Sequence, residues 1–186
     1  MLYSAVRCFV AGCLSAATSM ALADRLPPPQ VVSTVDLGRY MGTWYEIASN
    51  RPLFQADCFC TTATYTLREG AEPVVGVRNA CNRGSAEGRL TTVEGEARIP
   101  NPSVPAKLNV RFGPIALPGT NYWIIALADD YSWAVVSTAT RTPLYILARD
   151  RGLAQPTVDG ILDDLTDKGF DTSVLDFTVQ NGCSAN

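Results

Sequence analysis

The sequence predicts an all-β protein: an eight-stranded antiparallel up-and-down β-barrel with one C-terminal α-helix and a final short strand. Short runs rich in β-forming residues recur along residues 42–149, and turn signals such as Glu69-Gly70 and Pro118-Gly119 separate them. No segment with helical periodicity lies between these runs, so consecutive strands are expected to pair as neighbours. Eight such strands can close a barrel with room for one small ligand.

The first strand carries the most informative motif, Gly42-Thr43-Trp44. Glycine allows close approach of a neighbouring group, and Trp44, two residues further on, falls on the same strand face. An indole at this position can close the bottom of a small barrel. The predicted strands are 43–49, 61–68, 73–79, 88–99 (two strands or one bent strand), 107–112, 121–128, 132–138 and 144–149.

Residues 156–169 form the one stretch after residue 149 with helical period. Pro156 near its start and Gly169 after its end are typical helix punctuation. We expect this helix to lie against the sheet through a single apolar stripe, with its acidic residues exposed. The stripe consists of Val158, Ile161, Leu162 and Leu165, and residues 174–179 then predict the last strand.

The N-terminal 23 residues are interpreted as a secretory signal peptide. Arg7 is their single charge, residues 8–17 are apolar, and residues 21–23 fit a small-x-small cleavage site. A membrane-anchor helix is the alternative, which the short apolar run disfavours. Residues 10–13 also resemble a bacterial lipobox, which would acylate Cys13; we favour cleavage after Ala23, and either route exports the protein.

The remaining chain divides into an extended lead, 24–34, which contains three consecutive prolines, and a barrel domain, 35–186. All 18 acidic residues and 14 of the 15 basic residues follow residue 23, which leaves a net charge of −4. This charge disfavours nucleic acid as a partner. The sequence contains no histidine, so histidine triads, histidine general bases and histidine-ligated metals are excluded.

Four cysteines remain after the signal segment, namely Cys58, Cys60, Cys81 and Cys183. An even number in an exported chain predicts two disulfides, and four cysteines allow three pairings. Regular alternation would place Cys58 and Cys60 on one face, where a bond between them would be strained. Of the two pairings left, we favour Cys58–Cys81 with Cys60–Cys183. A zinc site is disfavoured because Cys-x-Cys has the wrong spacing for a common zinc knuckle.

The chain resembles a lipocalin, of the subgroup that contains bacterial outer-membrane lipocalins and apolipoprotein D. Three regions carry the resemblance: 42–47 with its Gly-x-Trp, 121–136 around the turn between the sixth and seventh strands, and 144–149. The second departs from the usual Thr-Asp-x-x-Tyr form at Ala128 and Asp129. Segments 105–112 and 169–175 also resemble this subgroup. The resemblance implies that Arg149 packs across Trp44, and it supports both favoured disulfides.

Alternation along 107–112 sorts the barrel residues. Leu108, Val110 and Phe112 alternate with two cations and an asparagine, so the apolar set is expected to point inward. The resemblance implies the same inward direction for Ala63, Tyr65, Tyr122, Ile124 and Tyr145. Packing of the core is the alternative role for each. Apolar walls with a few hydroxyl groups suit an acyl chain with a polar head.

Glu46 lies two residues after Trp44 and is therefore expected on the same inner face. A buried carboxylate needs a partner, which Arg149 or a tyrosine hydroxyl could supply. Glu46 is thus either a satisfied core acid or a polar anchor for a ligand head group. Gly42, Trp44 and Arg149 are interpreted as structural.

Together these features predict an exported lipocalin, not an enzyme, that binds a fatty acid, lysophospholipid or similar amphiphile for storage or transport at the cell envelope. We expect it in the periplasm or outer membrane, lipid-anchored if Cys13 is acylated, with no cofactor and no metal. The alternatives are a lipocalin-fold enzyme using Glu46 or the Asp129/Asp130 pair, and a sequestering or partner-binding protein. The apolar loop 112–119 could contact a membrane, another protomer or the ligand.

Overall fold

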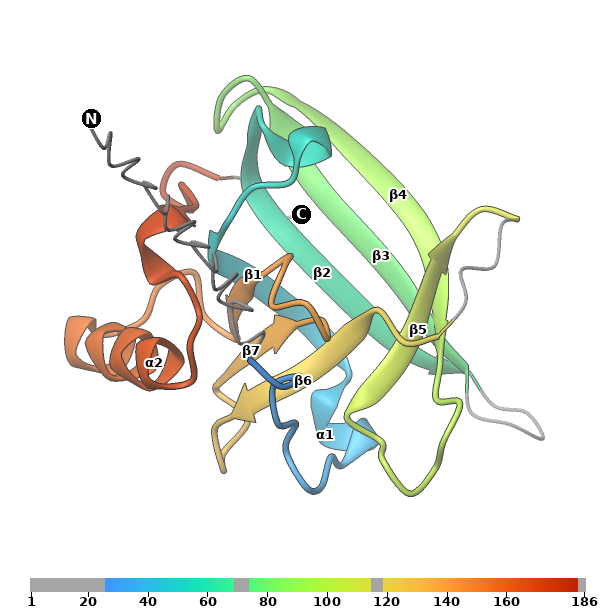
Figure 1. Cartoon of the computed structure of the whole chain (residues 1–186). Helices are drawn as coiled ribbons and strands as arrows, with labels where there is room; N and C mark the ends of the chain where they lie inside the picture. Colours follow the sequence, from blue (N-terminus) through green and yellow to red (C-terminus); the bar gives the residue numbers. More distant parts are fainter. Residues whose placement is uncertain (1–25, 69–73, 115–118, 184–186) are drawn as a thin grey trace, which may run out of the picture.

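The computed structural model describes residues 26–68, 74–114 and 119–183. The predicted signal segment and Cys13 lie outside the described residues. Within these ranges the chain forms one antiparallel sheet that closes on itself (Figure 1). The strands are β1 (Gly42–Ser49), β2 (Cys58–Arg68), β3 (Val74–Arg83), β4 (Arg89–Arg98), β5 (Lys107–Phe112), β6 (Tyr122–Leu127), β7 (Trp133–Ser137), β8 (Tyr145–Ala148) and β9 (Asp176–Phe177).

Strands β1 to β8 follow one another around the barrel, and β1 closes it by pairing with both β2 and β8. Gly42 lies opposite Tyr65 of β2, and Ser49 lies opposite Tyr145 of β8. Strand β9 adds a short pairing to β1. The predicted fold class, an eight-stranded up-and-down barrel with a C-terminal helix and a last strand, is confirmed.

The bounds of several predicted strands differ in detail: β2 begins at Cys58 and not at 61, and β3 ends at Arg83 and not at 79. Segment 88–99 forms the single strand β4, which pairs with β3 over its whole length. The predicted strand 174–179 shortens to β9, because its start is taken up by the 3₁₀ helix η2 (Thr172–Val174). The Asp171 side chain accepts a hydrogen bond from the Ser173 amide and fixes that turn.

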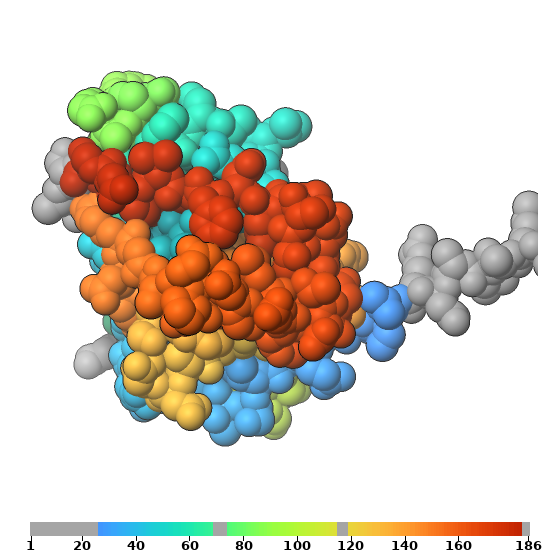
Figure 2. Space-filling model, turned by 90° about the vertical axis from the view of Figure 1, so that its left-hand side faces the viewer, coloured from blue at the N-terminus to red at the C-terminus, as the bar shows by residue number. Residues whose placement is uncertain are grey.

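The apolar residues form two layers separated by the sheet. One layer lines the interior of the barrel and includes Trp44, Tyr65 and Leu108. The other lies between the outer faces of β6, β7, β8 and β1 and the helix α2 (Gln155–Asp167), and includes Ile146 and Leu165. Figure 2 shows α2 and the C-terminal segment covering this side of the molecule. The predicted helical stripe is therefore the surface that joins α2 to the barrel.

Different short helices lie at the two ends of the barrel. The one-turn helix α1 (Leu37–Tyr40), with Asp36 as its N-cap, lies across the lower end in Figure 1. The 3₁₀ helix η1 (Leu53–Gln55), in the connection from β1 to β2, lies at the opposite, upper end. Among the described residues, no helix is long and apolar enough to cross a membrane.

Both favoured disulfides are present, Cys58–Cys81 and Cys60–Cys183. The expectation that regular alternation governs Cys58 and Cys60 is wrong. A β-bulge between Phe59 and Thr62 inserts one residue into β2, and Cys60 adopts a positive φ of 57°. Cys58 therefore bonds to the neighbouring strand, whereas Cys60 reaches the C-terminal segment.

Candidate ligand-binding site

Trp44 and Arg149 seal the lower end of the barrel. Trp44 is fully buried, and its indole Nε1 donates to the Tyr40 carbonyl at 2.9 Å. The guanidinium carbon of Arg149 lies 3.8 Å from the Trp44 ring centre. Its Nη1 and Nη2 donate to the carbonyls of Thr43 and Arg39, at 3.0 and 2.6 Å. Arg149 is thus held by backbone carbonyls of α1 and β1, in agreement with the structural role predicted for it.

Gly42 is needed at this point for two reasons. Its φ is +95°, a conformation that side chains rarely adopt, and a Cβ here would lie 3.3 Å from Arg149 Nη1. The Gly-x-Trp motif therefore combines a backbone position that only glycine suits with the indole that Arg149 covers.

Three tyrosine hydroxyls meet just above this seal. The Tyr122 hydroxyl lies 2.8 Å from that of Tyr40 and 2.9 Å from that of Tyr65. Tyr40 and Tyr65 are buried, and their rings stack with centroids 5.8 Å apart. Burial raises the pKa of all three, that of Tyr65 to about 12, so the hydroxyls stay protonated at neutral pH.

A cavity of about 10 Å³ lies beside these tyrosines. This volume matches one water molecule or one oxygen atom of a ligand. Its other walls are apolar and come from α1 and from β3 to β6. The lining includes Leu37, Val75, Ala97, Leu108, Val110 and Ile124, together with all three tyrosines.

The inner wall becomes more accessible from the base towards the upper end. Leu108 at the base is 6% exposed, Val110 is intermediate, and Phe112 is 42% exposed. On the neighbouring strand, Val93 is 47% exposed and shares the register parity of Ala97, which packs in the barrel interior. Phe112 lies over Gly95, where a Cβ would approach its ring within 2.7 Å. Large apolar side chains thus face inward yet remain open to solvent in the upper half.

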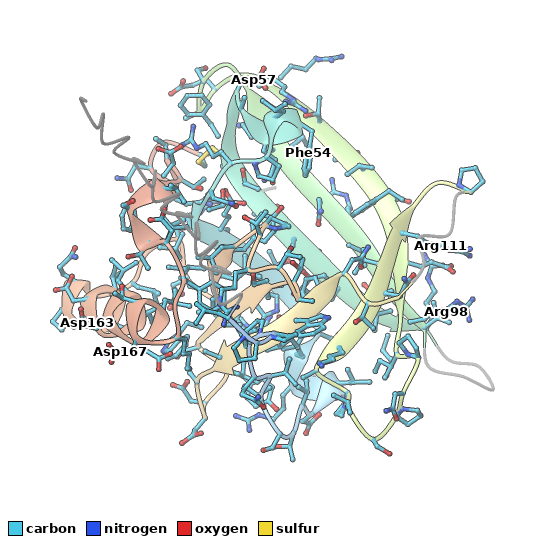
Figure 3. The ribbon with its side chains drawn as sticks, viewed as in Figure 1. Phe54, Asp57, Arg98, Arg111, Asp163 and Asp167 are labelled. Carbon is cyan, nitrogen blue, oxygen red and sulfur yellow. A yellow bond between two sulfur atoms is a disulfide. The ribbon has the colours of Figure 1, made fainter. Side chains whose placement is uncertain are left out.

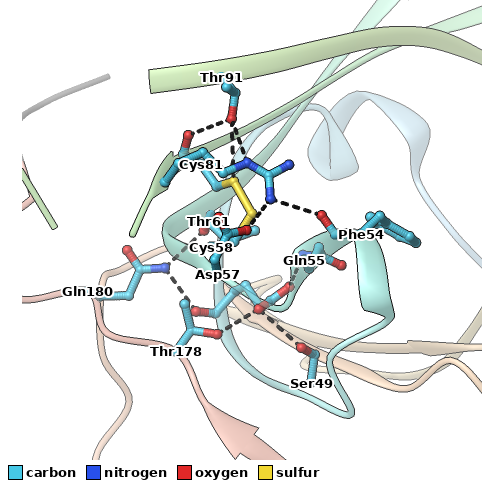
Figure 4. The surroundings of a disulfide bond; sticks show 12 residues. Ser49, Phe54, Gln55, Asp57, Cys58, Thr61, Cys81, Thr91, Thr178 and Gln180 are labelled. Carbon is cyan, nitrogen blue, oxygen red and sulfur yellow. Dashed lines mark hydrogen bonds and ion pairs between the residues drawn. A yellow bond between two sulfur atoms is a disulfide. The ribbon is translucent and has the colours of Figure 1, made fainter. Parts of the chain in front are cut away.

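Glu46 is 4% exposed and is held by a set of polar side chains different from the one predicted. Its carboxylate accepts hydrogen bonds from Ser49 Oγ at 3.2 Å, Gln55 Nε2 at 3.0 Å and Thr178 Oγ1 at 2.6 Å (Figure 4). Neither Arg149 nor a tyrosine supplies a bond, because Arg149 lies at the far end of β8 and the Tyr145 hydroxyl donates to Gln55, at 3.4 Å. The carboxylate joins β1, η1 and the C-terminal segment.

Contacts around the Cys58–Cys81 disulfide connect the segments that form the upper rim (Figure 4). Arg83 forms an ion pair with Asp57, donates to the Phe54 carbonyl at 3.1 Å, and donates through Nε to Thr91 at 3.2 Å. Figure 3 shows Phe54 and Asp57 at this upper end, whereas Asp163 and Asp167 lie on α2, outside the barrel. The connection that carries η1 is therefore anchored to β3 and β4 at the rim and to Glu46 inside.

Seven of the nine predicted lining residues pack in the barrel interior. Tyr65, Leu108 and Ile124 belong to the interior cluster, and Ala63, Val110, Tyr122 and Tyr145 pack against it. Phe112 lies higher on the same wall, and Glu46 lies below η1. The sequence reasoning missed Tyr40, Val93 and Gln55. Tyr40 precedes Trp44 by four residues, and Val93 follows from strand parity, but no local pattern marks Gln55.

The described part of the chain offers few other groups for catalysis or metal binding. Asp129 and Asp130 are exposed in the turn between β6 and β7, where the Asp130 carboxylate accepts a hydrogen bond from the Ser132 amide. Hydrogen bonding by Ser132, first through its side chain and then through its amide, lowers the pKa of Asp130. No group of three or more potential metal ligands occurs among the described residues. An open groove of about 720 Å³ lies between Val35 and Leu37 on one side and the 98–105 segment on the other, with Asn109, Gly119 and Thr120 completing its lining. None of the predicted lining residues borders it.

A closed barrel with a sealed base and an apolar, partly accessible inner wall defines the class of small-ligand-binding β-barrels. Residues 35–180 match the family of the Lipocalin-like domain, and the chain belongs to the lipocalins. Apolipoprotein D of Cavia porcellus is 35% identical over 167 residues, 86% of this chain and 84% of that protein. The outer membrane lipoprotein Blc of Escherichia coli K12 is 33% identical over 178 residues, 93% and 96% of the two chains.

Insecticyanin from the tobacco hornworm Manduca sexta has a similar fold, with a TM-score of 0.63 and 21% identity. The match covers 82% of this chain and 84% of that one. This similarity agrees with the strand order and closure described above. The family assignment rests on the sequence match, and members of the family bind small hydrophobic ligands.

Proposed function

We propose that this protein is an exported carrier that holds one fatty acid, lysophospholipid or similar amphiphile in its barrel, for storage or transport at the cell envelope. The observation that carries the proposal is the graded inner wall. Val93 and Phe112 are exposed although they face inward, whereas the base beneath them is sealed by Trp44 and Arg149. An acyl chain entering from the upper end would cover those two side chains and gain roughly 0.8 kcal/mol for each buried methylene.

Export is supported by the two disulfides, which form and persist in oxidising compartments. It is also supported by the predicted signal segment and by similarity to a protein named an outer membrane lipoprotein. Placement in the periplasm or outer membrane, and acylation of Cys13, belong to the same proposal. Mass spectrometry of the protein purified from the envelope of the cells that produce it distinguishes cleavage after Ala23 from lipidation at Cys13.

Ligand binding is tested by native mass spectrometry of the purified chain, followed by titration with dodecanoic acid and a lysophospholipid. We expect one acyl ligand per chain. Val93→Glu places a charge on the inner wall and should abolish binding, while Thr92→Glu, on the adjacent exposed position of the same strand, should leave it unchanged. Equal binding by both variants, or a chain that binds neither ligand, would refute the carrier function.

Enzymatic activity finds less support. The four cysteines in the barrel domain are in disulfides, so none offers a thiolate. Glu46 accepts three hydrogen bonds, and the Asp129/Asp130 pair lies in an exposed turn. No turnover of the bound lipid is expected.

A further inference from the structure

The three tyrosines at the base of the barrel have one more donor than they can use among themselves. Each hydroxyl carries one hydrogen, so Tyr40, Tyr65 and Tyr122 bring three donors. The cluster contains two hydroxyl–hydroxyl hydrogen bonds, through Tyr122, and each bond uses one hydrogen. No other described residue forms a hydrogen bond with these hydroxyls. Whatever direction the two bonds take, one O–H remains without a protein acceptor.

The remaining O–H donor is buried among apolar side chains. Tyr40 and Tyr65 are 4% and 6% exposed, and the cavity of about 10 Å³ beside all three tyrosines is otherwise lined by apolar side chains. A buried hydroxyl without an acceptor is unfavourable, so the site favours any oxygen acceptor that fits. The cavity has room for one such atom.

We propose that the cluster of Tyr40, Tyr65 and Tyr122 is a hydrogen-bond donor site for a neutral oxygen acceptor at the deep end of the ligand, so that the barrel prefers oxygenated acyl chains over plain ones. The inference rests on the carrier function proposed above and names the ligand class that the base recognises.

A neutral acceptor suits this position better than a carboxylate. An ionised group at the base would lose its hydration without gaining a counter-ion, because the Arg149 guanidinium lies behind Trp44 and already donates to two backbone carbonyls. The hydroxyls themselves resist ionisation, since burial raises their pKa. They therefore present a donor and no charge. A carboxylate at the other end of the ligand would remain near the accessible upper wall.

The route to this site follows the inner wall. Phe112, Val110 and Leu108 form one inward row on β5, from exposed to buried, and Leu108 lies opposite Tyr122 in the register with β6. An extended chain lying along this row would bring its terminal atoms to the tyrosines.

The test compares two acids that differ only at the remote end, dodecanoic acid and 11-oxododecanoic acid, by calorimetric titration of the purified chain. We expect the keto acid to bind more tightly to the wild type, by about three- to tenfold, the range of one net hydrogen bond. Isotope-edited infrared spectra should show the ketone stretch of the bound keto acid at lower frequency than in an apolar solvent.

The variant Tyr40→Phe/Tyr65→Phe/Tyr122→Phe removes every donor and should bind both acids equally. Tyr45→Phe, on the outer face of β1, is the matched control and should keep the preference. If the triple variant does not fold, the single variant Tyr122→Phe still tests the proposed donor site. It leaves two unpartnered hydroxyls, so the preference must persist or grow, and its loss contradicts the inference.

The outcomes separate the two proposals. Equal affinity of the wild type for both acids, with an unshifted ketone band, means that a water molecule occupies the donor, and the inference alone is overturned. A wild type that binds neither acid overturns the carrier function and the inference together.

Discussion

The two disulfides close loops of very different length, and this difference predicts how much stability each contributes. Cys60–Cys183 joins residues 123 apart in sequence, and Cys58–Cys81 joins residues 23 apart. In the chain-entropy model, cross-linking removes about 2.1 + 1.5R ln n cal/mol/K from the unfolded chain. At 25 °C this amounts to about 5 kcal/mol for the long loop and about 3.5 kcal/mol for the short one.

The matched variants are Cys60→Ala/Cys183→Ala and Cys58→Ala/Cys81→Ala. Each removes one bond between cysteines whose Cα atoms lie 5.7 and 5.4 Å apart, respectively, so the lengths spanned are similar. We expect the first variant to lose about 1.5 kcal/mol more free energy of unfolding than the second. The folded barrel should persist in both, because the strand pairings that close it involve neither bond.

The assay is urea unfolding followed by tryptophan fluorescence, with free energies from linear extrapolation. The m-value should rise in both variants, and more in the long-loop variant, because the freed unfolded chain exposes more surface. Equal losses, or a greater loss from the short-loop variant, would refute the loop-entropy reasoning and place the contribution in local packing of the bulge around Cys60.

Three further predictions concern the seal, the helix and the tyrosine cluster. Arg149→Lys loses the paired carbonyl bonds and the stacking on Trp44, and should lower the unfolding free energy by about 1–2 kcal/mol; an unchanged melting temperature would contradict the structural role. Leu165→Ala removes a fully buried side chain between α2 and the sheet and should cost about 2–5 kcal/mol in urea unfolding, whereas a loss under about 0.5 kcal/mol would mean that α2 contributes little to the folded state. Because the folded-state pKa of Tyr65 is raised from 10.0 to about 12, its contribution to stability is complete below pH 10 and is lost as the pH rises from 10 through about 12. Tyr65→Phe should weaken this alkaline decline of stability, and an identical decline in both proteins would show that Tyr65 titrates normally.

The sequence predicts the direction of the Glu46 side chain but not its hydrogen-bond partners. Its inward direction follows from its spacing to Trp44, because strand side chains alternate with a period of two. Its partners do not follow, since Gln55 comes from a connecting loop and Thr178 is 132 residues away. Those contacts exist only after the barrel has closed and β9 has returned to β1.

Periodicity and punctuation in the sequence determine the eight strands, the helix after them and the inward row on β5, because these depend on residues close together in the chain. The positive φ that favours glycine at position 42 is likewise a local property, whereas the contact of Arg149 with Trp44 depends on the tertiary structure. The tertiary structure alone decides that Tyr40 from α1, Tyr65 from β2 and Tyr122 from β6 meet with their hydroxyls within hydrogen-bonding distance. Such convergence depends on barrel closure and strand register, which bring together groups up to 82 residues apart.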